Sequence, residues 1–133
     1  MKPQEIDHIA IAVKDLESAI NFYTQILGAS IEHREFVESD GIEEVLLKVS
    51  DTYIQLLCPT TAGSPVAKYI EKRGEGLHHM GLRVNNCEEA LRDAVAAGAT
   101  SIDAHPRPGS RGTTVAFLHP KSTFGVLIEL VQP

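Results

Sequence analysis

The first half of the chain is repeated in the second half, and this repeat restricts the fold more than any other feature. Residues 7–29 (DHIAIAVKDLESAINFYTQILGA) can be aligned over residues 78–100 (HHMGLRVNNCEEALRDAVAAGAT). Farther along, residues 53–59 (YIQLLCP) align over residues 127–133 (LIELVQP). Each copy begins with a short apolar strand and a helix whose apolar residues recur with a period of 3.6. Each then has room for two more strands before its last one.

The repeat predicts an α+β fold made of two paired βαβββ modules that form a cupped mixed β-sheet. We expect one domain over residues 1–133, with module 1 at about 5–59, a connector at 60–75 and module 2 at about 76–133. In the connector, Pro65 directly after Ser64 is typical of the first turn of a helix. The middle strands are expected near residues 30–37 and 43–49 in module 1, and near 100–104 and 113–118 in module 2.

The composition excludes several classes of protein. The 133 residues are 43% hydrophobic and 23% charged, with a net charge of −6 and no basic run, which argues against nucleic acid as a partner. No apolar run reaches about 18 residues, so we expect no membrane-spanning helix. The first residues lack the apolar region of a signal peptide, which favours a cytoplasmic protein. We expect Cys58 and Cys87 to be reduced thiols.

Two histidines stand side by side in EGLHHMGLRV, and strand alternation separates them. His79 falls on the face with Gly81, and His78 falls on the opposite, bulky face. The repeat aligns His8 with His79, and His8 is again on a face of small residues. We expect the bulky faces to pack under the helices and the small faces to leave space above the sheet. His78 is then a packed strand-end histidine.

The repeat also pairs Gln55 with Glu129 on strands that are otherwise apolar. A buried carboxylate is costly unless it is paired or bound to a metal. A lone strand histidine or glutamine is more often an ordinary core or edge residue, and a distant basic partner for Glu129 is the alternative. Together, His8, Gln55, His79 and Glu129 predict a site for a borderline-to-hard divalent metal ion. The absence of thiolate ligands argues against structural zinc.

These segments resemble the vicinal oxygen chelate superfamily, which includes glyoxalases, bleomycin resistance proteins and dioxygenases. Within it, the chain resembles the methylmalonyl-CoA epimerases from residue 6 to residue 132. The markers are GLHHM, HPKSTFGVLIEL and the connector SPVAKYIEKRG.

The resemblance implies an isomerase that epimerises (2R)- and (2S)-methylmalonyl-CoA by proton transfer at the α-carbon, through a metal-stabilised enolate. It implies a metal ion, cobalt first and Mn²⁺, Ni²⁺ or Zn²⁺ otherwise, held by residues matching His8, Gln55, His79 and Glu129. It assigns acid–base catalysis to Glu44 and Glu129, so that Glu129 would be both a ligand and a base. It further implies an acyl-CoA substrate, a role in propionate metabolism and a homodimer.

Three alternatives remain open. A lactoylglutathione lyase of the glyoxalase I type uses a similar metal set. A ring-cleaving dioxygenase of this fold usually has two histidines and one carboxylate, and Gln55 as a fourth ligand weakens that reading. A non-enzymatic module that sequesters antibiotics shares the topology and generally lacks the metal ligands.

Overall fold

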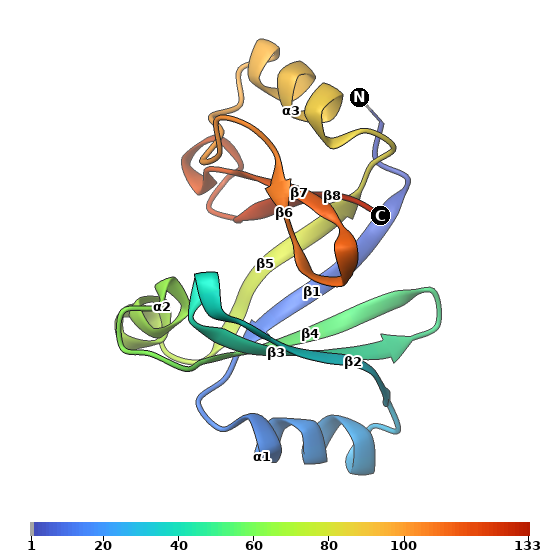
Figure 1. Cartoon of the computed structure of the whole chain (residues 1–133), viewed down its shortest axis with the longest axis vertical. Coiled ribbons are helices and arrows are strands. Elements are labelled where there is room, and N and C mark those ends of the chain that lie inside the picture. Colours follow the sequence, from blue (N-terminus) through green and yellow to red (C-terminus); the bar gives the residue numbers. More distant parts are fainter. Residues whose placement is uncertain (1) are drawn as a thin grey trace. The chain divides into compact units, whose positions relative to one another are not determined.

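The computed structural model describes residues 2–133 (Figure 1). The chain divides into two compact units. One unit is Ile9–His78, and the other combines the residues up to His8 with His79–Pro133. Strands β1 (Glu5–Ala12) and β5 (Gly76–Arg83) contribute residues to both units.

The unit Ile9–His78 contains a sheet in the order β2-β3-β4-β1 and two α-helices. Helix α1 begins after Asp15, whose side chain accepts a hydrogen bond from the backbone N–H of Ser18 at 3.0 Å. The helix continues as a π-helical segment and ends before Gly28, which has a φ of +74°. The elements are α1 (Leu16–Asn21), the π segment (Phe22–Ile26), β2 (Ser30–Val37), β3 (Ile42–Val49), β4 (Thr52–Pro59) and α2 (Pro65–Arg73).

Each face of this sheet is covered by a helix. Leu16 and Ile20 of α1 pack on one face, against buried residues of β3 and β4. Val66 and Ile70 of α2 pack in a second cluster with Ala10 and Ala12 of β1, which have no exposed surface. The expectation that the small face of β1 leaves open space is therefore wrong at these two alanines. Their small side chains let α2 approach the strand closely.

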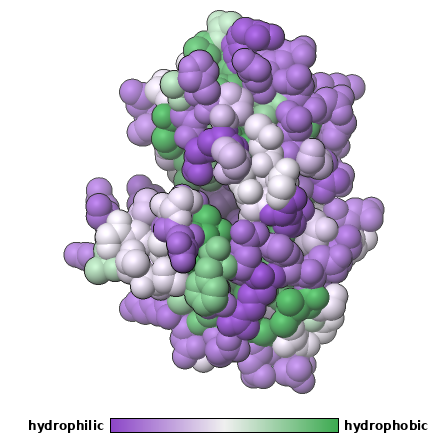
Figure 2. Space-filling model, in the orientation of Figure 1, coloured by the Kyte–Doolittle hydropathy of each residue, from purple (hydrophilic) through white to green (hydrophobic). Residues whose placement is uncertain are grey.

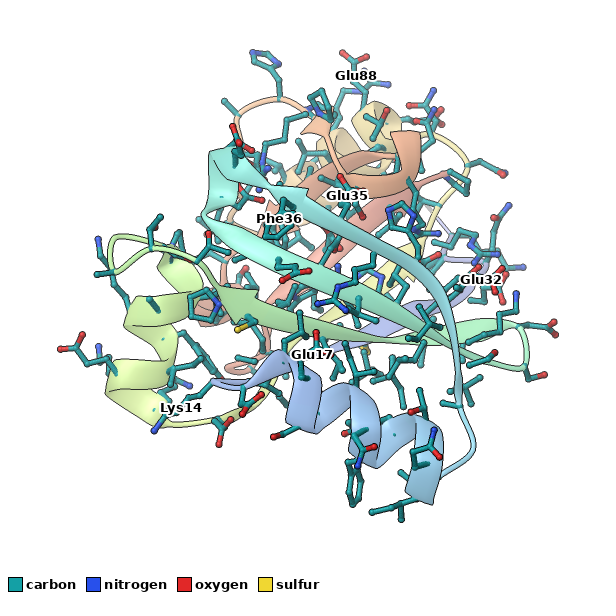
Figure 3. All side chains as sticks on the ribbon, turned by 60° about the horizontal axis from the view of Figure 1, so that its bottom comes forward. Lys14, Glu17, Glu32, Glu35, Phe36 and Glu88 are labelled. Carbon is teal, nitrogen blue, oxygen red and sulfur yellow. The ribbon has the colours of Figure 1, made fainter. Side chains whose placement is uncertain are left out.

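Strand alternation places Glu43 of β3 on the same face as the apolar residues Val45 and Leu47. The structure supplies a partner for this carboxylate. Arg34 of β2 donates from Nε to Glu43 at 2.6 Å and from a terminal nitrogen to Glu17 of α1 at 2.5 Å. Glu17 is labelled in Figure 3. The guanidinium thus links α1 to the two strands beneath it.

The second unit has strands in the order β1-β5-β8-β7-β6. Strands β5 and β8 run parallel, whereas β7 and β8 run antiparallel, so the sheet is mixed. Helix α3 packs Cys87, Ala90 and Leu91 against β7 and β8. The elements are α3 (Cys87–Ala96), β6 (Arg107–Pro108), β7 (Thr114–Leu118) and β8 (Ile128–Gln132).

The predicted α+β class with two βαβββ modules is confirmed, since β1-α1-β2-β3-β4 and β5-α3-β6-β7-β8 follow the same order. One strand was predicted in the wrong place. Residues 100–104 form only an isolated bridge from Ser101 to Leu118, and the short β6 lies farther along the chain, at Arg107–Pro108. The single domain over residues 1–133, with the module bounds given above, stays a prediction.

Among residues 2–133, no helix is long and apolar enough to cross a membrane. Hydrophobic residues nevertheless reach the surface in patches between hydrophilic ones (Figure 2). Strand β2 is an edge strand of its sheet, and on it Ile31 is 49% exposed and Phe36 is 67% exposed. Cys58 and Cys87 are free thiols.

Candidate active site

Three polar side chains converge in the unit that contains α3. They are His8 of β1, His79 of β5 and Glu129 of β8. Nε2 of His8 lies 3.0 Å from Nε2 of His79 and 2.9 Å from Oε1 of Glu129, and the same oxygen lies 3.4 Å from Nε2 of His79. All three residues are at least nine-tenths buried.

Strand pairing explains this convergence. The start of β1 meets the end of β5, since the backbone N–H of Gln4 donates to the carbonyl of Arg83 at 2.8 Å. Parallel pairing sets Gly81 of β5 beside Glu129 of β8. Gly81 also makes room for an imidazole, because a Cβ there would lie 2.3 Å from Cε1 of His8. A glycine is therefore required at this position of β5, where the strand faces the ring of His8.

Asp7 fixes the orientation of His8, although adjacent residues of a regular strand point to opposite faces. Its carboxylate, 1% exposed, accepts a hydrogen bond from Nδ1 of His8 at 2.7 Å. Arg83 donates to the same carboxylate at 2.9 and 3.1 Å, and Arg111 donates at 3.0 Å. Because an ionised carboxylate only accepts hydrogen bonds, Nδ1 of His8 carries a proton and Nε2 is directed toward Glu129.

The electrostatics of the cluster favour positive charge at its centre. Burial opposes ionisation of Glu129, but hydrogen bonds from His79 and His8 lower its pKa to about 2. Burial alone would lower the pKa of His8, yet its bonds to Asp7 and Glu129 raise that pKa to about 9. Burial also opposes ionisation of Asp7, but the bonds from His8 and Arg83 hold its pKa well below the usual range. Burial lowers the pKa of His79, which keeps it neutral. Without a metal, Nε2 of His8 therefore carries a proton at a position where a metal cation would also be stabilised.

The spacing of the three ligand atoms fits one metal ion. Atoms bound at about 2.1 Å from an ion lie about 3.0 Å apart at a right angle and about 3.4 Å apart at a tetrahedral angle. The measured separations of 2.9, 3.0 and 3.4 Å cover this range. A ligating histidine also commonly gives its other N–H to a carboxylate, as His8 does to Asp7.

Gln55 and Glu44 lie in the unit Ile9–His78 and contact each other. Gln55 of β4 donates from Nε2 to Oε2 of Glu44 on β3, and the two residues are 7% and 2% exposed. The hairpin that joins their strands pairs Val49 with Thr52. Oε1 of Gln55 is buried and has no hydrogen-bond partner within residues 2–133. A buried amide oxygen in this state is available to a cation or to a donor.

The structure thus brings together His8, His79 and Glu129 in one unit, and Gln55 and Glu44 in the other. The roles predicted for these five residues remain predictions. His78 contacts the ring of Tyr69 at 4.8 Å between centroids, in agreement with its assignment as a packed strand-end histidine.

Two residues of the site were missed in the sequence. Asp7 was not predicted to belong to the site, because strict alternation points adjacent side chains to opposite faces, although its place directly before His8 was a signal. Gly81 was noted only as a small residue. Its contact with His8 depends on how β1 and β5 pair, and one sequence cannot give that spacing.

Comparisons with known proteins agree with this geometry. Residues 7–117 match the family described as the Glyoxalase/Bleomycin resistance protein/Dioxygenase superfamily. The mitochondrial methylmalonyl-CoA epimerase of Homo sapiens is 37% identical over 128 residues, which cover 96% of this chain and 73% of that protein. The ethylmalonyl-CoA/methylmalonyl-CoA epimerase of Cereibacter sphaeroides is 36% identical over 129 residues, 96% of each chain.

A solved structure extends the similarity to three dimensions. It is a variant of the Streptomyces coelicolor methylmalonyl-CoA epimerase in complex with 2-nitronate-propionyl-CoA. The two chains are 38% identical and superpose with a TM-score of 0.95, covering 98% of each. The chain therefore belongs to the Glyoxalase/Bleomycin resistance protein/Dioxygenase superfamily, and within it to the family of the methylmalonyl-CoA epimerases.

Proposed function

We propose that this chain is a metal-dependent epimerase that interconverts (2R)- and (2S)-methylmalonyl-CoA by proton transfer at the α-carbon. The observation that carries the proposal is the buried convergence of His8, His79 and Glu129, with ligand-atom separations suited to one ion. The near full-length similarity to epimerases named for this substrate supports the same reaction. The reaction needs an electrophile for a developing negative charge and acid–base groups for the proton.

The proposed metal is divalent, with cobalt as the first candidate and Mn²⁺, Ni²⁺ or Zn²⁺ as others. His8, His79 and Glu129 would hold it, and the internal repeat assigns Gln55 as the fourth ligand. When bound, such an ion acts as a Lewis acid toward an oxygen of the substrate. Asp7 keeps a proton on Nδ1 of His8, which leaves Nε2 for the ion.

Glu44 is the proposed acid–base group that is not a ligand. Epimerisation requires one proton to leave the α-carbon and another to arrive on the opposite face. Glu44 is buried, and the hydrogen bond from Gln55 holds its carboxylate in one orientation. A carboxylate removed from water and held in place is suited to take up or return such a proton.

Glu129 was also assigned as a base by family resemblance. In the metal-free chain, its hydrogen bonds to the two histidines lower its pKa to about 2. This keeps it ionised, as a metal ligand must be, and makes it a weak base. Its role as a ligand is therefore better supported than its role as a second base.

An acyl-CoA is the proposed partner, and a role in propionate metabolism and a cytoplasmic location stay predictions. A homodimer is proposed because β2 lies at the edge of its sheet and exposes Ile31 and Phe36. Exposed edge strands with apolar residues are usually covered in native proteins.

The test supplies the cobalt-loaded chain with two substrates in separate assays. One is a single epimer of methylmalonyl-CoA, and the other is the hemithioacetal of glutathione and methylglyoxal. We expect the first to be converted to its other epimer and the second to be left unchanged. Turnover of the hemithioacetal alone would replace the proposal by a lactoylglutathione lyase. A chain that binds no metal and turns over neither substrate would favour a sequestering module.

A further inference from the structure

Beside Glu44, two more titratable side chains occupy the same face of the sheet. Glu35 of β2 is the direct cross-strand partner of Glu44, and His33 lies two residues before Glu35. Nε2 of His33 lies 2.6 Å from Oε1 of Glu35. One ring nitrogen of His33 and one carboxylate oxygen from each glutamate all lie within 4.8 Å of one another. The three groups therefore form a series of proton acceptors whose neighbours are in hydrogen-bond contact or close enough for one water molecule to join them.

One end of the series lies in the interior, and the other two groups both reach the solvent. Glu44 is 2% exposed. The side chains of Glu35 and His33 are 35% and 33% exposed. Glu35 is labelled in Figure 3. On the other side of Glu44, the amide of Gln55 donates a hydrogen bond and so cannot accept a proton from it through that nitrogen.

A buried base in an epimerase needs such a path, and this argument rests on the proposed function. In each turnover, one group takes a proton from the α-carbon and the opposite group gives one. The free enzyme is then left with both groups in the reverse protonation state. Glu44 must exchange its proton with water before the next turnover in the same direction. Because its own contact with solvent is so small, a relay would speed this step.

We propose that Glu35 and His33 carry the proton between Glu44 and solvent. The protonated carboxyl of Glu44 gives its proton to the carboxylate of Glu35, directly or across one water molecule, which fits a gap of this size. Glu35 passes the proton to Nε2 of neutral His33. The resulting imidazolium releases a proton from Nδ1 to water, and the reverse sequence reloads Glu44. An imidazole is suited to the last step because one ring nitrogen can take up a proton while the other releases one. Neither residue contacts the substrate, and both act through Glu44.

The test compares His33→Ala and Glu35→Gln with Glu32→Gln, a change at an exposed glutamate of the same strand, also labelled in Figure 3. Epimerisation of methylmalonyl-CoA is measured in one direction with increasing concentrations of imidazole. We expect kcat to fall by about tenfold or more in both relay variants. This loss is smaller than the loss expected on removal of a group that acts on the substrate itself. KM should stay unchanged. Free imidazole should restore kcat in His33→Ala and leave Glu44→Gln unchanged, and Glu32→Gln should behave like the parent chain.

Three outcomes would overturn the relay. The first is an unchanged kcat in both variants, measured against an active parent. The second is a loss of kcat in His33→Ala that imidazole does not restore, at an unchanged melting temperature. Such a loss would indicate a structural role for His33. The third is a second equivalent of bound metal in the parent that His33→Ala loses, which would indicate a metal site at these residues. An inactive parent chain would instead overturn the proposed function itself.

Discussion

Nε2 of His8 lies 2.9 Å from Oε1 of Glu129, and these two buried groups come from the first and last strands of the chain. Their proximity explains why the sequence carries a glutamate inside the apolar run GVLIELV. The cost of burying that carboxylate is offset by the two imidazoles that face it.

The two adjacent histidines should differ in metal binding. His79→Ala removes a side chain whose Nε2 lies 3.0 Å from that of His8, so we expect a loss of most of the bound metal. His78→Ala removes a ring that packs on Tyr69, so its metal content should match that of the parent. Elemental analysis of the two purified variants makes the comparison. Equal loss in both, or loss in neither, would contradict the site.

Gly81 should tolerate no side chain. In Gly81→Ala, the new Cβ would lie 2.3 Å from the His8 ring, which must move. We expect a destabilisation of about 1–3 kcal/mol, typical of overpacking, together with weaker metal binding. Gly63→Ala is the matched control, because a Cβ there meets no atom within 4 Å. Denaturant unfolding and metal titration measure both effects. If Gly81→Ala matches the control in stability and in metal affinity, the His8 ring can adopt another position and the prediction is wrong.

The metal-free chain should lose stability at alkaline pH. The pKa of His8 is raised from 6.5 to about 9 in the folded state, opposed by burial and favoured by Asp7 and Glu129. A raised pKa stabilises the fold fully below pH 6.5, and the contribution is lost as the pH rises through about 9. The melting temperature of the metal-free chain should therefore fall across this range. In His8→Gln, which has no titrating imidazole at this position, the fall should be smaller. Identical pH profiles for parent and variant would rule out His8 as the titrating group.

A homodimer is expected from the exposed edge of β2. Phe36→Lys places a charge on a residue that is 67% exposed, and it should shift a dimer toward monomer. Light scattering at micromolar concentration measures the mass of both chains. A parent chain that is monomeric under these conditions would contradict the dimer.

Much of the fold could be predicted because the repeat occurs where hydrophobic periodicity is strong. The Ser64–Pro65 pair marked the start of α2, and strand 30–37 was predicted with the bounds it has. Module 2 was harder. Its β6 has only two residues, Arg107 and Pro108, and so short a strand has no alternation to detect.

The candidate site was predictable in its residue types and less so in its contacts. The repeat paired His8 with His79 and Gln55 with Glu129 without any distance information. Asp7 was missed because alternation is only an average rule, and this carboxylate turns toward His8 to meet two arginines. Strand alternation puts His33 and Glu35 on one face, but their position beside Glu44 depends on the cross-strand pairing of Glu35 with Glu44, which one sequence cannot give.

The most direct test measures the uptake of deuterium from D₂O into each epimer of methylmalonyl-CoA. The parent chain and Glu44→Gln are compared, and the metal content of both is determined. The parent should interconvert the epimers with deuterium at the α-carbon. Glu44→Gln should keep its metal, because no ligand is lost, and should lose about 10²- to 10⁴-fold in epimerisation, with residual exchange confined to one epimer. A Glu44→Gln variant that holds its metal and still interconverts the epimers at the parental rate would contradict the account.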